Sequence, residues 1–473
     1  MAGASAKIQR RSTDGISAFP DDVLLEVLSR VGNVKDLFRL AVTCRRWLRR
    51  FTDPAFLCRL CPGQGEGHRA RLLGFFFQQT RFLELPRGSM NKILEMMRTA
   101  QYASVFAPSF LPAPGSPLGS LTADHRDLTA FVPDGGGTFN YAEPLAARRG
   151  IVLMRLAPRT LDDFKRMTRT ISHLGLCNPI TGERHVLPPL ECPDHGRCDS
   201  YAIVTAADSD DLDGKQTPPA GRFRFSQLLL ITVITLSRSG INNVYLHSYS
   251  AGARSWSTPT VCLDGSRFSM TGDRSAVVHR GAAHWLCIAQ PCLYRADYRL
   301  YKLNVEVGRG TATGNARVSL QLVDIPGRGG SSPLLFVDGD DKLSVACVNF
   351  LHVIVWTQQQ GGGKEDDDTP GVWLRTSVIR TSMAAPNSPL CQPCGECTWL
   401  DFSNGSMLVL TTTGGVFVLD LGNKVMEKFM DGLMPLFFSN QRNFLSPEKH
   451  GACVAYDVDL VDFFVTHLAR WSM

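Results

Sequence analysis

The sequence predicts an α+β chain in which a small helical module precedes a much larger all-β domain. Two changes along the chain support this division. Before position 61, apolar residues recur at helical spacing, whereas after position 70 short apolar runs alternate with turns that contain glycine or proline. With 473 residues, the chain is long enough for one small module and one large domain.

We expect four consecutive parts: a disordered tail at 1–16, the helical module at 17–60, a linker at 61–69 and the β-rich domain at 70–473. Three stretches of the β-rich domain are rich in proline, glycine or aspartate, and we expect them to be mobile surface loops near 108–127, 206–222 and 358–370. Solvated spacers are the favoured interpretation of these loops, and recognition elements are the alternative.

Charge and hydropathy argue against nucleic-acid and membrane partners. The net charge of +6 is too small to indicate nucleic-acid binding, and the arginine cluster at 45–50 is interpreted as the solvated face of a helix. The longest apolar run, at 228–236, has about half the length of a membrane span and predicts a buried strand. Helical spacing of Leu460, Phe463, Phe464 and Leu468 predicts a helix that packs over the β-rich domain rather than binding a membrane. The N-terminal segment lacks the apolar core of a secretory signal, so we expect a cytoplasmic or nuclear protein whose 14 cysteines are mostly reduced.

The helical module carries more apolar surface than so short a unit can enclose. An apolar stripe follows Pro20 and the aspartates that suit the first turn of a helix. This stripe consists of Leu24, Val27, Leu28 and Val31, with Val23 and Leu25 beside it. Two further short helices also place apolar residues on more than one side. Three helices in about 45 residues cannot bury two apolar faces each, so the pattern predicts a protein-binding surface on an unfinished core that only a second polypeptide covers. The alternative is a three-helix unit that is buried against the C-terminal region of its own chain.

The stretch "FPDDVLLEVLSRVGNVKDLFRLAVTCRRW" resembles the F-box, with Phe19 at a position where leucine is commoner. The resemblance implies docking on a Skp-type adaptor, which links the chain to a cullin and a ubiquitin-conjugating enzyme. We expect about half of the implied contact residues to touch the adaptor and the others to pack the F-box itself. The candidates are Phe19, Pro20, Leu24, Leu28, Leu37, Leu40, Val42, Cys44 and Trp47.

Two weak repeats organise the β-rich domain. The first repeat is a strand, a turn and a second strand, and it occurs in "LGLCNPITGERHVLPP", "VYLHSYSAGARSWSTP" and "VFVLDLGNKVMEKF". The second repeat is a strand followed by a glycine and an aromatic residue, and it occurs in "VVHRGAAHWLC" and "LDFSNGSMLVL". Repeats in an all-β region favour the radial blades of a β-propeller, which leave few exposed strand edges. Because the spacing is irregular, a pair of β-sandwiches is the alternative.

The same domain is similar to the kelch-like F-box-associated β-domain of plant F-box proteins. The segments "LCNPITGERHVLPPL", "YSAGARSWS", "VVHRGAAHWL" and "VWLRTSV" carry this similarity, and most of their defining residues suit turns and blade packing. The resemblance implies that the β-rich domain captures a target protein through loops at one end of the blades. It does not name the residues that do so.

Cysteine spacing raises the question of a metal site. Cys391, Cys394 and Cys397 form two overlapping Cys-x-x-Cys pairs, and Cys192, His195 and Cys198 would complete a zinc site only if the fold brought both segments together. Free thiols in a loop are the favoured interpretation, and no cofactor is expected. The aspartates near 209–214 lack the bidentate glutamate of a calcium loop, since Ala220 stands at that position.

No nucleotide-binding loop, nucleophile elbow or zinc-protease motif occurs in the sequence, and His284 is interpreted as a core residue rather than a base. Together with this absence of catalytic motifs, the resemblance to the F-box implies a non-catalytic substrate receptor in an SCF-type (Skp–cullin–F-box) ubiquitin ligase, which acts by proximity. Two alternatives stay open: an enzyme with its active site in the mouth of a propeller, and an F-box scaffold without a role in degradation. The target protein and its degron are not predicted.

Overall fold

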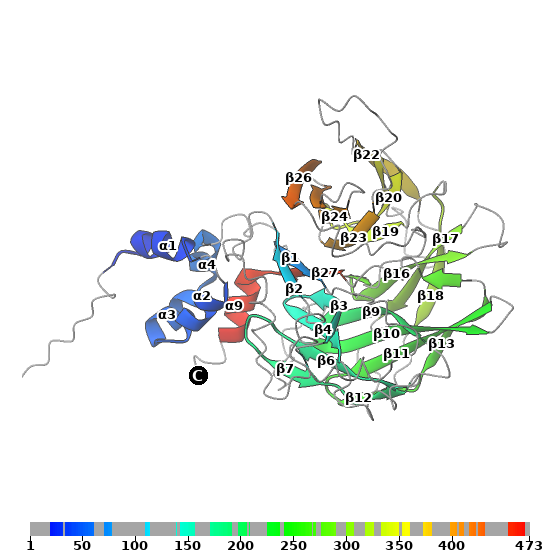
Figure 1. Cartoon of the computed structure of the whole chain (residues 1–473), viewed down its shortest axis with the longest axis horizontal. Helices are drawn as coiled ribbons and strands as arrows, with labels where there is room; N and C mark the ends of the chain where they lie inside the picture. The colour runs from blue at the N-terminus through cyan, green and yellow to red at the C-terminus, as the bar shows by residue number, and fades with distance from the viewer. Residues whose placement is uncertain are drawn as a thin grey trace, which may run out of the picture.

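The computed structural model describes residues 19–31, 34–60, 71–77, 109–113, 139, 142–156, 171–191, 197–205, 208, 225–236, 241–266, 268–270, 276–289, 299–306, 317–325, 333–349, 352–359, 372–380, 398–403, 406–410, 416–421, 424–430 and 453–468. The predicted N-terminal tail and linker lie outside this part of the chain, as do most of the three predicted loops. Helices gather at one side of the molecule and strands form the rest (Figure 1).

The N-terminal module contains four helices, where the sequence predicted three. They are α1 (Asp21–Ser29), α2 (Val34–Ala41), α3 (Arg45–Phe51) and α4 (Pro54–Leu60). The fourth helix starts at Pro54, a residue that suits the first helical position because its missing N–H would be unpaired there. It buries Phe56, Leu57 and Leu60, so the module has more core than three helices would supply.

Antiparallel strands form six sheets of three to five strands in the described part of the chain. Sheet 1 contains β2 (Ser109–Pro112), β1 (Arg71–Phe77) and β27 (Cys453–Val458). Sheet 2 contains β3 (Glu143–Arg148), β4 (Ile151–Arg155), β6 (Leu174–Cys177) and β7 (Arg184–Val186). Sheet 3 contains β9 (Arg197–Thr205), β10 (Phe225–Leu236), β11 (Ile241–Ser250), β12 (Ser255–Trp256) and β13 (Thr260–Ser266).

The remaining sheets follow in chain order. Sheet 4 contains β14 (Phe268–Met270), β15 (Val277–His279), β16 (Ala282–Ala289), β17 (Arg299–Glu306) and β18 (Val318–Val323). Sheet 5 contains β19 (Leu334–Val337), β20 (Leu343–Asn349), β21 (His352–Gln358) and β22 (Trp373–Arg380). Sheet 6 contains β23 (Thr398–Ser403), β24 (Ser406–Leu410), β25 (Val416–Asp420) and β26 (Val425–Met430). A two-stranded sheet pairs β5 (Ile171–Ser172) with β8 (Leu190–Glu191).

The sheets contact one another in a series that returns to its start. Strand β27 contacts β3, β3 contacts β9, β9 contacts β15, β15 contacts β19, β19 contacts β23, and β23 contacts β27. Sheet 1 combines β1, which follows the helical module, with β27 from near the C-terminus. No single sheet closes on itself among the described strands.

Separate hydrophobic cores fill the spaces between neighbouring sheets 2 to 6. Strand β10 shows why the apolar run at 228–236 is continuous. Its Leu228 and Leu230 pack against sheet 2, whereas Leu229 and Ile231 pack against sheet 4. A strand buried on both faces needs apolar residues at successive positions, so the predicted buried strand is confirmed.

The two sequence repeats fall at equivalent places in different sheets. The first repeat forms the hairpins β6–β7, β11–β12 and β25–β26, which join the third and fourth strands of sheets 2, 3 and 6. The second repeat forms β15–β16 and β23–β24, which join an early strand to the next strand of sheets 4 and 6. Each repeat therefore forms the same hairpin in different sheets, which indicates that these sheets share one strand order.

Candidate functional site

The helical module is completed by a helix from the other end of the chain. Helix α9 (Leu460–Leu468), which the spacing of its apolar residues predicted, contacts both α3 and α4. Phe51 of α3 lies against Phe464 with ring centroids 5.1 Å apart, and Phe38 of α2 lies 5.9 Å from the ring of Phe463. The core of the module is thus closed by a segment of the same polypeptide.

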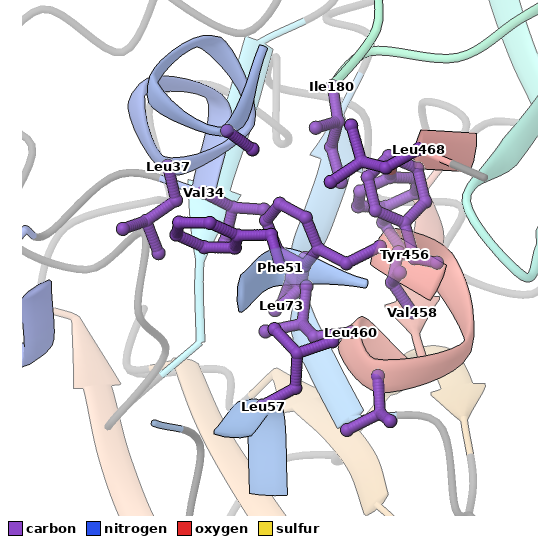
Figure 2. Packing of buried hydrophobic residues seen from close by; sticks show 14 of the residues in the cluster. Val34, Leu37, Phe51, Leu57, Leu73, Ile180, Tyr456, Val458, Leu460 and Leu468 are labelled. Carbon is purple, nitrogen blue, oxygen red and sulfur yellow. The ribbon is translucent and has the colours of Figure 1, made fainter. Parts of the chain in front are cut away.

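One continuous core joins the module, α9 and the β-rich domain. Figure 2 shows Phe51 and Leu57 of the module together with Leu460 of α9 and Leu73 of β1. Hydrogen bonds reinforce this junction: the Gly150 amide donates to Asp457 O at 3.1 Å, and the Tyr456 hydroxyl donates to Gly150 O at 3.3 Å. The α9 helix follows β27 directly, so it connects the module to sheet 1.

Four of the nine adaptor-contact candidates lie in this core. Leu24, Leu28, Leu37 and Trp47 are buried, and the side chains that cover the module's core include those of α9. The expectation that only a second polypeptide would cover these leucines and this tryptophan is therefore wrong, because the residues that pack around them belong to the same chain. Leu40 is half-buried against the same core.

The other four candidates remain on the surface. Phe19 is 50 % exposed and Val42 is 40 % exposed, and Pro20 and Cys44 are exposed as well.

Two apolar residues outside the candidate set are also exposed on α1. Val23 is 44 % and Val27 is 58 % exposed. They lie four residues apart, so their side chains are neighbours on one face of the helix. We call Phe19, Val23 and Val27 the apolar α1 face. The sequence placed Val27 in the same stripe as Leu24 and Leu28, and a wide stripe does not reveal which of its edges is covered.

Ion pairs hold α1 against the other helices. Arg50 of α3 lies 2.7 Å from Asp21, and Arg59 of α4 pairs with Asp22. The first-turn aspartates therefore do more than favour the start of α1, since they also contact α3 and α4. Of the arginines interpreted as a solvated helix face, Arg45 and Arg49 are exposed, whereas Arg46 and the ion-paired Arg50 are half-buried.

Other sequence candidates give no site in the described residues. Cys391, Cys394, Cys397, Cys192 and His195 lie outside them, as does the side chain of Cys198. Among the residues that the structure does describe, no group of three or more histidine, cysteine, aspartate or glutamate side chains could hold a metal ion.

His284 is 8 % exposed, and its Nδ1 lies 2.7 Å from Asn304 Oδ1. This burial and the contact with Asn304 confirm its interpretation as a core residue, and the burial lowers the pKa of the imidazole to about 4. In the described part of the chain, no helix has the length and hydrophobicity to cross a bilayer.

The geometry of the module agrees with a sequence comparison. Residues 16–62 match the F-box-like family model. The chain carries an F-box-like domain. F-box domains in general bind Skp-type adaptors, and their presence suggests the role of an SCF substrate receptor. No curated protein matches the chain.

Solved structures resemble the β-rich domain only distantly. Pyrococcus horikoshii acylaminoacyl peptidase is 8% identical at a TM-score of 0.29, with 62% of this chain and 39% of the peptidase covered. A Fusarium graminearum α-L-arabinofuranosidase is 10% identical at a TM-score of 0.30, with coverages of 61% and 79%. A neuraminidase-like protein from A/bat/Guatemala/164/2009 is 8% identical at a TM-score of 0.32, with coverages of 68% and 83%. Similarities at these scores identify neither a fold nor an activity.

Proposed function

We propose that this chain is the substrate-receptor subunit of an SCF-type ubiquitin ligase. Its F-box docks on a Skp-type adaptor, which connects it to a cullin, and its β-rich domain captures a target protein for ubiquitination. The observation that carries the proposal is an F-box-like domain at 16–62 whose core is closed while the apolar α1 face stays exposed. A closed core that still displays large apolar side chains is typical of a protein-binding surface.

The chain contributes proximity rather than chemistry in this proposal. Holding a target near a charged conjugating enzyme raises its effective concentration, and the bond-forming steps belong to other subunits. The shared core of the F-box, α9 and sheet 1 supports this role, because a rigid connection restricts the positions that a bound target can occupy. We place the protein in the cytoplasm or nucleus.

We further propose that the β-rich domain is a propeller of six sheets, of the kelch-like F-box-associated type found in plants. The circular series of contacts from β27 through β3, β9, β15, β19 and β23 supports this architecture, as do the equivalent positions of the sequence repeats. A strand from near the end of the chain completes the first sheet, which is a common way to close a ring of repeats. Paired sandwiches would not require the contact of β23 with β27.

The proposed adaptor docking is tested by co-expression of the full chain with a Skp-type adaptor. Val23→Asp plus Val27→Asp should abolish co-purification because it places two carboxylates in the apolar α1 face. Val186→Asp plus Val372→Asp is a matched control, since these valines are 58 % and 63 % exposed on the β-rich domain. Equal recovery of the adaptor with both double variants would contradict the docking surface.

A further inference from the structure

One end of the β-rich domain is occupied by its own turns and by the F-box. Strand β27 runs into α9 at this end, which we call the F-box end. The turn between β3 and β4 lies here as well, because Gly150 is hydrogen-bonded to Asp457 near the end of β27. Arg148, the last residue of β3 before this turn, pairs with Asp208 and also donates to Ile203 O at 3.2 Å.

Further turns interlock at the F-box end. Arg148 Nη2 donates to Val278 O of β15 at 3.3 Å. Arg280, in the turn that follows β15, lies 3.3 Å from Asp341 in the turn between β19 and β20, and His279 Nε2 lies 3.1 Å from Asp341 O. Residues at this end of sheets 2, 4 and 5 therefore contact their neighbours.

The opposite end contains a cavity between sheets 4 and 5. Strand β16 begins at the F-box end with Ala282 and runs to Ala289 at the opposite end. Its antiparallel partner β17 therefore begins at that opposite end with Arg299. Strand β18 ends there at Val323 because it pairs antiparallel with β17. The cavity has a volume of about 310 Å³ and is bounded by these strand ends and by Cys347 of β20.

The cavity combines apolar walls with two exposed charges. Leu300 and Val323 are buried in its walls, and Leu322 is 39 % exposed. Arg299 and Asp324 also line the cavity, and neither forms an ion pair with another residue in the described part of the chain. The Cys347 thiol has its pKa raised to about 12 by burial, so it stays protonated and serves as part of the apolar wall.

We propose that this cavity is the target-capture site, and that it binds a peptide segment with an aliphatic side chain next to a carboxylate. This inference rests on the proposed receptor function and adds the chemistry of the target. Its volume lies at the lower end of known ligand pockets and suits one or two side chains. The guanidinium of Arg299 is matched to a carboxylate, with which it can form paired hydrogen bonds, whereas the Asp324 carboxylate can accept hydrogen bonds from backbone N–H groups of the same peptide.

The position of the cavity is also compatible with adaptor binding. It lies at the end of the sheets away from the turn of Gly150, whereas the F-box is joined to the molecule beside that turn through α9. A target bound between sheets 4 and 5 therefore leaves the apolar α1 face free. Both partners can be held at once, as a receptor requires.

The test measures binding of peptide pools to the full chain that has been co-expressed with the adaptor. Immobilised hexapeptides carry Leu-Asp, Leu-Asn or Leu-Lys at the two central positions and mixed residues elsewhere. The wild-type chain should bind the Leu-Asp pool at least about tenfold more tightly than the Leu-Lys pool, since hydrogen bonds to a charged group are strong. The Leu-Asn pool should bind with intermediate strength.

Charge reversal at the cavity gives the sharpest result. Arg299→Glu should reverse the order of the Leu-Asp and Leu-Lys pools, and Leu322→Ser should weaken every pool. Arg254→Glu is the matched control, because Arg254 is exposed in the β11–β12 turn at the F-box end and its replacement should leave the order unchanged. Each variant should still co-purify with the adaptor.

Three results would overturn the inference: binding that is unaffected by Arg299→Glu, equal effects of Arg299→Glu and Arg254→Glu, or no binding of any pool to a chain that retains the adaptor. Any of these leaves the proposed receptor function standing. Loss of the adaptor from the wild-type chain would instead contradict that function, and the peptide measurement on the chain alone would still decide the role of the cavity.

Discussion

Phe51 of the F-box and Phe464 of the C-terminal helix are both fully buried, and their rings lie 5.1 Å apart at an angle of 41°. This contact joins two segments from opposite ends of the chain. The F-box therefore depends on α9 for part of its core, and α9 is itself anchored by β27 to the β-rich domain. Stability of the adaptor-binding module and integrity of the C-terminus are expected to be coupled.

Phe464→Ala tests this coupling. Removing a buried phenylalanine ring should lower the free energy of unfolding by about 3–5 kcal/mol, and here the cavity would open beside Phe51 in the F-box core. We expect weaker adaptor binding together with a lower melting temperature, as measured by co-purification and by thermal denaturation of the full chain.

Phe336→Ala provides the control for Phe464→Ala. Phe336 is 3 % exposed, but it lies in the core between sheets 5 and 6. Its replacement should reduce stability to a similar extent while adaptor recovery from folded protein stays normal. If Phe336→Ala impaired adaptor binding as strongly as Phe464→Ala, the effect would reflect general instability rather than the junction with α9.

Neighbouring positions on α1 should respond to the same substitution in different ways. Leu24 is 5 % exposed and Val23 is 44 % exposed. Leu24→Asp buries a carboxylate in the core and should destabilise the F-box by several kcal/mol. Val23→Asp should change stability by no more than about 0.5 kcal/mol, because it lies at the surface.

Adaptor binding distinguishes the two variants further. Thermal melting followed by circular dichroism should give a lower melting temperature for Leu24→Asp than for Val23→Asp. The folded Val23→Asp protein should then bind the adaptor more weakly than the wild type. A Val23→Asp protein that melts normally and binds the adaptor with wild-type affinity would remove Val23 from the docking surface. Leu24→Asp cannot test docking by itself, since it removes part of the module's core.

Local patterns in the sequence predicted individual helices and strands, but they did not predict which distant segment packs against each element. The spacing of Leu460, Phe463 and Phe464 predicted a helix, and the continuous run around Leu229 predicted a buried strand. Neither pattern states which surface the element will cover. The covering of the F-box core by α9 depends on the pairing of β27 with β1, and no local signal in residues 17–60 records that pairing.

The same reasoning explains the outcome for the site residues. Leu24 and Val27 both belong to a helical apolar stripe, and only the position of the neighbouring helices exposes Val27. The cavity beside Arg299 was not predicted at all, because its walls come from strand ends in two sheets. A basic residue at the first position of a strand is too common a feature to identify such a site.

Asp208 links stability to acidic pH. Burial alone would raise the pKa of this carboxyl, but its hydrogen bonds and charge interactions with Arg148, together with the charge of Arg149, lower the pKa below its usual value. A carboxyl whose pKa is lower in the folded state stabilises the fold above its unfolded pKa, and this contribution is lost as pH falls through the folded pKa.

Asp208→Asn should therefore destabilise the protein at pH 7 by about 3 kcal/mol, since it leaves Arg148 partly buried without its counter-charge. The difference from wild type should shrink below about pH 4, where the carboxyl of the unfolded chain becomes protonated while that of the folded chain is still charged. Thermal denaturation at pH 7, 5 and 3 measures this. A difference that stayed constant over this range would show that the ion pair does not stabilise the fold.

Lys302 should destabilise the fold at neutral pH, whereas Asp208 stabilises it. Its side chain is buried, and its Nζ donates to Gln358 Oε1 at 3.0 Å, a neutral partner between sheets 4 and 5. Burial lowers the pKa of this ammonium to about 8, so the folded state binds fewer protons than the unfolded state between about pH 8 and pH 10. By linkage, stability should rise with pH across this interval.

Lys302→Met removes the buried charge and keeps most of the side-chain volume. At pH 7 it should stabilise the protein by about 2 kcal/mol, because an ammonium group that is poorly solvated is replaced by an apolar group. The gain should diminish as pH approaches 10, where the wild-type lysine becomes neutral without unfolding. Arg375→Met, at an exposed position of sheet 5, is the control and should show no such pH dependence. Destabilisation by Lys302→Met at pH 7 would mean that the bond to Gln358 outweighs the burial of the charge, and that Lys302 fastens sheet 4 to sheet 5.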